Sequence, residues 1–125
     1  MEFTVDAAGF ALVCDVTRMG DDCLISLRGG DKAHIGSTAM AVPRESLTGV
    51  GRSATVSTLN RMGHKDDFLA NPIAHKVAAR MDCVAVCAAG VHVDDATPEQ
   101  IAAIQAAVPT VIDRVCDILK EADHD

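Results

Sequence analysis

The sequence contains no tryptophan, no tyrosine and only three phenylalanines. Its hydrophobic core must therefore be built from aliphatic side chains, and it lacks the aromatic platforms on which proteins stack single-stranded nucleic acid. Positive charge is also scarce, since 11 Lys and Arg face 18 Asp and Glu, for a net charge of −7. Such a surface repels phosphate backbones and anionic lipids. The composition thus excludes nucleic acids and membranes as main partners.

Long apolar runs are absent as well. No stretch reaches the ~20 residues that a membrane-spanning helix needs. The first residues, Met1-Glu2-Phe3-Thr4-Val5-Asp6, carry acids where a signal peptide carries positive charge. We therefore expect a soluble, cytoplasmic protein. Its 125 residues suit one domain, which we place at residues 1–120, followed by a frayed acidic tail at 121–125.

The five cysteines form no CxxC pair and lie in apolar segments. Cys83 and Cys87 share the run Cys83-Val84-Ala85-Val86-Cys87, which is typical of a strand. Four residues of strand separate their Cα atoms by about 13 Å, too far for a disulfide or a shared metal ion. We predict buried, reduced thiols that act as small hydrophobic residues.

The first half of the chain alternates in the manner of β-strands. Two runs, 10–17 and 23–28, flank a Gly-Asp-Asp turn and predict a hairpin. A second pair of strands is expected at 37–42 and 53–59. A further run, 83–93, is apolar on both faces, as an interior strand would be.

Helices are predicted on both sides of that interior strand. Asn71 and Pro72 suit the N-cap and first position of one helix, which continues to Met81. Thr97-Pro98-Glu99-Gln100 is a capping box that begins a second, long helix, which Pro109 should kink. We predict an α+β fold, a two-layer sandwich in which two helices pack on one face of a largely antiparallel sheet.

Three histidines lie in glycine-flanked turns between these elements. They are His34, His64 and His92, and an acid stands two residues after each of the last two, at Asp66 and Asp94. Glycine allows close approach of the backbone to a ligand, and imidazole can bind a metal, move a proton or donate to a phosphate. Each histidine taken alone is more often a solvated loop residue. Three in separate turns favour a binding surface.

The segment from Gly29-Gly30 to Gly36-Ser37-Thr38 is a second candidate feature. Backbone N–H groups and hydroxyls in such a loop can surround a phosphate. The order of a Walker loop and the GxGxxG pattern are both absent. An anion-binding turn and a simple bend between strands remain equal interpretations.

The three turns together resemble a known family. The patterns Gly29-Gly30-x-x-x-His34-Ile35-Gly36, His64-Lys65-Asp66 and Gly90-Val91-His92-Val93 are similar to those of the LpdD-like prenylated flavin chaperones, the small accessory proteins of gallate-type decarboxylases. The resemblance implies a chain that is not itself a decarboxylase. It implies instead a carrier that binds prenylated FMN, or FMN, and loads it into a UbiD-type decarboxylase large subunit. A flavin prenyltransferase is a further partner, and we expect a homo-oligomer.

The flavin site that follows from the resemblance and the glycine-rich turn combines residues of all three segments. The set is Gly29, Gly30, His34, Ile35, Gly36, Ser37, His64, Lys65, Asp66, Gly90 and His92.

Two other functions stay open from the sequence. The first is a small metal-dependent enzyme that holds a divalent ion with His34, His64 and His92 and uses Asp66 or Asp94 as general base. The second is a protein that binds no ligand and stabilises a decarboxylase as one of its subunits. No assembled catalytic triad or pair of acids is visible, which speaks against an independent enzyme.

Overall fold

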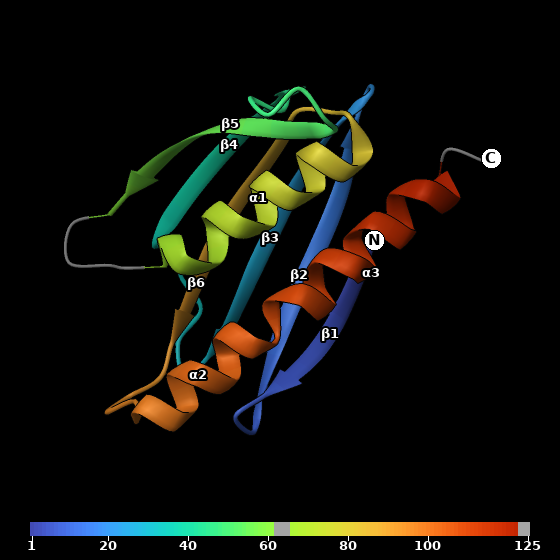
Figure 1. Cartoon of the computed structure of the whole chain (residues 1–125). Helices are drawn as coiled ribbons and strands as arrows, with labels where there is room; N and C mark the ends of the chain where they lie inside the picture. The colour runs from blue at the N-terminus through green and yellow to red at the C-terminus, as the bar shows by residue number, and fades with distance from the viewer. Residues whose placement is uncertain (62–65, 123–125) are drawn as a thin grey trace.

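The computed structural model describes residues 1–61 and 66–122. Six strands form one sheet in the order β1-β2-β3-β6-β4-β5. The strands are β1 (Glu2–Ala7), β2 (Phe10–Met19), β3 (Asp22–Gly30), β4 (Ser37–Glu45), β5 (Arg52–Asn60) and β6 (Ala85–His92). The helices are α1 (Asp67–Met81), α2 (Pro98–Ala106) and α3 (Val108–Ala122). The α+β sandwich is confirmed, and Figure 1 shows α1 and α3 lying across the same face of the sheet.

The sheet is antiparallel except at its centre. The hairpin β2–β3 forms as predicted, with Cys14 opposite Leu27, and so does the pair β4–β5. Strand β6 lies between β3 and β4, parallel to the first and antiparallel to the second. The prediction of an interior strand is therefore confirmed, although the strand itself begins at Ala85 rather than at Cys83.

Helix α1 begins earlier than the sequence indicated. The prediction placed the N-cap at Asn71, whereas Asp66 precedes the first turn and its carbonyl accepts the N–H groups of Leu69 and Ala70 at 3.0 and 3.1 Å. Leu69 and Ala70 are fully buried, so the extra turn adds apolar contact with the sheet. The amide of Asn71 instead donates to Thr58 Oγ1 of β5. Burial of the first turn outweighs the local capping signal.

The predicted long C-terminal helix is interrupted at Ala107, two residues before Pro109. The capping box at Thr97 forms as predicted, with Gln100 N–H donating to Thr97 Oγ1. A single residue in the αR conformation, Ala107, separates α2 from α3, and Pro109 occupies the first turn of α3, where its missing N–H costs nothing. Helix α3 continues through Ala122, two residues past the predicted domain end at 120. No helix in the two described ranges is long and apolar enough to cross a bilayer.

The core is aliphatic and contains the thiols. All five cysteines are free and buried, as predicted. Burial raises the pKa of the Cys14 thiol from 9.0 to about 12, and it also raises the pKa of Cys87. A pKa that is raised in the folded state adds stability below pH 9, and this contribution is lost as the pH rises through 9 towards 12.

The buried thiols give a first prediction. In native protein at pH 8, a thiol-specific reagent such as DTNB should find no fast-reacting cysteine, because the reactive thiolate is suppressed and access is blocked. In guanidinium chloride all five cysteines should react at once. A rapidly reacting thiol in the folded protein would contradict this burial.

Candidate functional site

One end of the sheet brings two of the three histidine turns together. Strands β3 and β6 run parallel, so their last residues, Gly30 and His92, are register partners. Both strands end at the lower end of the sheet in Figure 1. The chain leaves β3 there and returns as β4, and the N–H of Asp31 donates to the carbonyl of His92 at 2.6 Å. The turn after β3 and the turn after β6 thus form one surface.

A buried histidine–carboxylate pair lies at the centre of this surface. His34 Nε2 lies 3.1 Å from Asp66 Oδ2, and the two side chains are only 9% and 7% exposed. The carboxylate oxygen accepts, so the imidazole N–H donates. The other oxygen, Asp66 Oδ1, accepts the N–H of Val91 at 3.2 Å. Since Asp66 also precedes α1, one carboxylate connects the turn after β3, strand β6 and the start of the helix.

Two of the predicted glycines are required by this pair. A Cβ atom on Gly36 would overlap Asp66 Oδ2 and lie 3.0 Å from His34 Nε2. A Cβ atom on Gly90 would overlap the carbonyl oxygen of His34 and lie 3.2 Å from its Cγ. Any side chain at either position would move the histidine or its carboxylate. The glycines therefore belong to the site because they leave room for His34 and Asp66.

His92 is held more loosely beside His34. Their rings meet edge to face with centroids 6.4 Å apart, and His92 Nε2 lies 2.9 Å from Asp94 Oδ1. The side chain of His92 is 51% exposed. Gly30 has a φ of +80°, and a Cβ atom there would overlap the carbonyl oxygen of His92. The buried His34 and the half-exposed His92 thus lie side by side on the same surface.

A small cavity opens at these histidines. It has a volume of about 190 Å³ and is lined by Lys32, His34, Arg61 and His92. The N–H of Arg61 donates to the carbonyl of Gly36, which fixes the end of β5 against this turn. Two cations and two imidazoles therefore meet in a protein whose net charge is −7. Such an arrangement suits an anion, because the side chains of Lys32 and Arg61 can donate to a phosphate or carboxylate oxygen. Both ring nitrogens of His34 lie near oxygen atoms of the protein, Nδ1 at 3.3 Å from the carbonyl of Lys32 and Nε2 at 3.1 Å from Asp66.

The remaining predicted residues lie in different surroundings. Ile35 follows His34 and is 66% exposed, but it is not among the residues that line the cavity. Gly29 packs against β2, where a Cβ atom would lie 2.6 Å from the carbonyl oxygen of Ala11. His64 and Lys65 lie outside the described residues.

Ser37 was expected in the flavin site, but its side chain lies elsewhere. Its side chain is 1% exposed, on the face of β4 that the helices cover, and its Oγ has no hydrogen-bond partner among the described residues. The hydroxyl therefore faces the interior rather than the cavity. The cationic side chains that line the cavity, Lys32 and Arg61, are left to contact an anion.

Lys32 was missed as a site residue. Its only signal in the sequence is its position two residues before His34, within a segment already identified by its glycines. Arg61 directly follows β5 and becomes significant only once that strand is placed beside the turn. Neither residue is distinguishable from a solvated surface cation without the fold.

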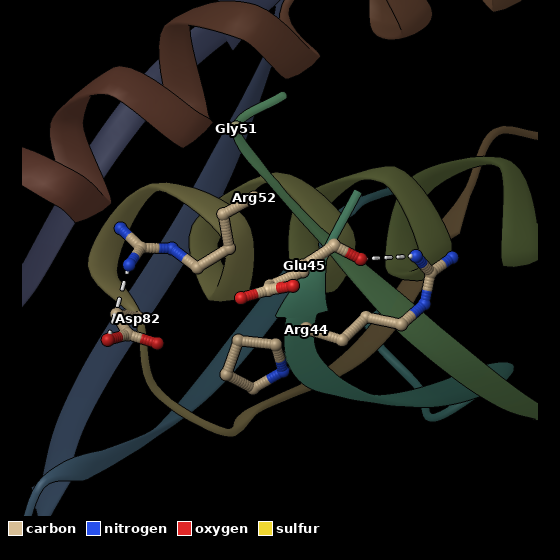
Figure 2. A pocket seen from close by; sticks show the side chains of 6 residues that line it. Arg44, Glu45, Gly51, Arg52 and Asp82 are labelled. Carbon is tan, nitrogen blue, oxygen red and sulfur yellow. Dashed lines mark hydrogen bonds and ion pairs between the residues drawn. The ribbon is translucent and has the colours of Figure 1, made fainter. Parts of the chain in front are cut away.

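A larger cavity lies at the other end of β4 and β5. Its volume is about 530 Å³, and it is lined by the end of β4, by Gly51 and Arg52 at the start of β5, and by Asp82 (Figure 2). Its cations are already engaged. Arg52 forms an ion pair with Asp82 at 3.2 Å, and Arg44 donates to Thr55 Oγ1 and to the carbonyl of Glu45. This cavity is the weaker candidate for an anion, since both guanidinium groups already donate to partners within the protein.

The three-histidine metal site remains a prediction, because His64 is not described. Within 1–61 and 66–122, no three His, Cys, Asp or Glu side chains are grouped to hold a metal ion. The Nε2 atoms of His34 and His92 each face a carboxylate of their own.

Comparison with known proteins gives the family. The profile of the "Prenylated flavin chaperone LpdD-like domain" matches residues 6–120. Protein LpdD of Lactiplantibacillus plantarum is 31% identical over 103 residues, which are 81% of this chain and 71% of that protein. A solved chaperone complex for assembly of the yeast 20S proteasome shares the fold, with a TM-score of 0.52 at 16% identity over 97% of this chain and 94% of the other. The chain belongs to the family of LpdD-like prenylated flavin chaperones.

Proposed function

We propose that this chain binds prenylated FMN at the histidine turns and delivers it to a UbiD-type (de)carboxylase, whose own large subunit carries out the chemistry. The observation that carries this proposal is the cavity lined by Lys32, His34, Arg61 and His92. In an acidic protein, a group of cations around a small cavity selects an anionic ligand by local potential. The name of the family supports a prenylated flavin as that ligand, and the FMN form that we propose carries a phosphate group.

The size of the cavity suits only part of this ligand. Sites that enclose a whole organic ligand measure ~300–1,000 Å³, whereas this one measures about 190 Å³. It can therefore hold the phosphate and the adjoining part of the ribityl chain. The ring system would remain at the surface, where the exposed Ile35 offers apolar contact. A carrier that has to release its ligand benefits from such partial enclosure.

The histidines have a binding role in this proposal rather than a chemical one. His34 is fixed by Asp66, so it presents a rigid polar edge, and His92 is exposed and able to adjust to the ligand. A flavin prenyltransferase would supply the ligand, and the decarboxylase would accept it. No chemical step is assigned to this chain.

The phosphate requirement is directly testable. FMN should bind at least ten times more tightly than riboflavin, because two charge-assisted hydrogen bonds contribute ~1.5–3 kcal/mol each and 1.4 kcal/mol is a factor of ten. Flavin absorbance and fluorescence can be followed in titrations without interference from the protein, which has no Trp or Tyr.

A charge-matched pair of variants provides the control. Lys32→Gln should remove most of the preference for FMN, whereas Lys76→Gln, on the exposed side of α1, should leave it unchanged. Equal affinities of the unmodified protein for FMN and riboflavin would remove the phosphate from the proposal. Absence of flavin binding altogether would favour a protein that stabilises the decarboxylase without a ligand.

A further inference from the structure

The cationic cavity lies on the face of the sheet that α1 and α3 leave open (Figure 1). Ala89 of β6 is buried in the core under the helices, so alternation turns its neighbour Gly90 to the opposite side. A Cβ atom on Gly90 would overlap the carbonyl oxygen of His34. The turn that carries His34 therefore covers one end of this second face, which we call the open face.

The open face continues from the cavity as two rows of uncharged side chains, which we call the floor. The N–H of Arg61 donates to the carbonyl of Gly36, so Arg61 extends β5, and Leu59 lies two residues before it on the same side of the strand. Register pairing gives the members of the floor, which are Leu59, Thr38 and Ala88 in the row nearer the cavity and Ser57, Met40 and Val86 in the next row. The floor is therefore continuous with the surface that lines the cavity.

The floor exposes apolar side chains although it belongs to the sheet. Leu59 is 78% exposed and Met40 is 47% exposed, and small or hydroxyl side chains surround them. Two acids on the neighbouring strands β2 and β3 are engaged elsewhere, since Asp15 forms an ion pair with Arg28 and Asp22 accepts a backbone N–H just before β6. An apolar surface beside a group of cations suits a ligand that is apolar at one end and anionic at the other.

The dimensions of the floor agree with those of a flavin nucleotide whose phosphate occupies the cavity. An extended ribityl chain separates the phosphorus of FMN from the ring system by roughly 9 Å, at about 1.3 Å of advance per bond. Side chains on one face of a strand recur every two residues, so the two rows of the floor lie about 7 and 13 Å beyond Arg61. Three strands about 4.8 Å apart give the floor a width of roughly 10 Å, which suits a system of fused rings.

We propose that the floor binds the ring system of the prenylated flavin, flat against the sheet, while the phosphate lies in the cationic cavity. This inference rests on the proposed function and adds the second part of the ligand site. Leu59 and Met40 can cover one face of the rings, and a methionine thioether contacts aromatic rings favourably. The prenyl-derived part of the ligand is also apolar, so it increases the area that the floor removes from water. The hydroxyl groups of Thr38 and Ser57 are available to the polar edge of the rings.

Paired titrations with FMN and riboflavin test the floor separately from the cavity. Leu59→Ser and Met40→Ser should each weaken the binding of both flavins about five-fold, because both flavins contain the rings that these side chains contact. The ratio of the two affinities should stay at its wild-type value, whereas Lys32→Gln should lower that ratio. Leu47→Ser is the matched control. Leu47 is 91% exposed in the connection at the opposite end of β4 and β5, and its replacement should change neither affinity.

Circular dichroism must show that the variants fold, which is expected above all for Leu59→Ser because this side chain is largely exposed. A wild-type chain that prefers FMN to riboflavin, together with floor variants of unchanged affinity, would overturn the floor and leave the cavity in place. A wild-type chain that binds neither flavin would overturn both this inference and the proposed function. If the floor variants keep their flavin affinity but no longer associate with the decarboxylase, the open face contacts a protein, and the inference is wrong.

Discussion

Replacing Gly90 by alanine is expected to lower the free energy of unfolding by about 3 kcal/mol, at the upper end of the range for overpacked interiors. The added methyl group would overlap the carbonyl oxygen of His34, and a backbone atom cannot rotate away as a side chain can. The turn would have to move as a unit, which would separate His34 from Asp66. For a domain of this size the melting temperature should fall by about 10 °C. Circular dichroism is the suitable readout, since the chain lacks the aromatic residues used in fluorescence.

Gly20→Ala is the matched control for this substitution. Gly20 lies in the β2–β3 turn at a φ of +64°, and a Cβ atom there meets nothing within 4 Å. Its cost should be limited to the left-handed backbone, ~1–2 kcal/mol. If Gly90→Ala melts at the wild-type temperature, the close approach of His34 to β6 is wrong. If the two variants lose equal stability, the overlap at Gly90 adds nothing to the free-energy cost of the substitution.

Much of the fold was predictable because its local patterns are clear. Alternation identified the hairpin β2–β3 and the pair β4–β5, and the capping box at Thr97 marked the start of α2. Strand β1 was missed, although its apolar residues Phe3, Val5 and Ala7 alternate with polar ones and both Phe3 and Ala7 are buried. The start of α1 was wrong because the choice between Asp66 and Asn71 depends on the burial of Leu69 against the sheet, and that is a tertiary effect.

The sequence was enough to predict which residue types form the candidate site. It was not enough to predict which of the separate segments contact one another. Glycine beside histidine indicated close packing, and Gly36 and Gly90 do accommodate the pair of His34 and Asp66. The parallel pairing of β3 with β6 could not be inferred, because the two strands are more than fifty residues apart and joined through three other elements. Without that pairing nothing places His92 beside His34. Arg61 was a nearby cation in the sequence, and the fold makes it part of the cavity.

The largest functional effect is expected in cofactor delivery. A UbiD-type decarboxylase co-expressed with this chain and a flavin prenyltransferase should gain at least ten-fold in activity, while this chain alone should consume no carboxylate substrate. The gain should depend on the cationic cavity, so Lys32→Ala combined with Arg61→Ala should remove most of it. Both side chains line the cavity from exposed positions, and their removal leaves the buried pair of His34 and Asp66 in place.

Substrate consumption in lysates, together with the flavin content of the purified decarboxylase, separates the alternatives. Lys76→Ala removes one cation from α1, away from the cavity, and should activate as well as the wild type. If the double variant activates fully, the cavity does not carry the cofactor, and stabilisation of the decarboxylase becomes the better account. If the double variant lowers activity but not the flavin content of the decarboxylase, the cavity acts after loading, and delivery is wrong. A loss of both, with the circular dichroism spectrum unchanged, is the result that a phosphate-binding carrier requires, because the same two cations then determine how much flavin reaches the enzyme.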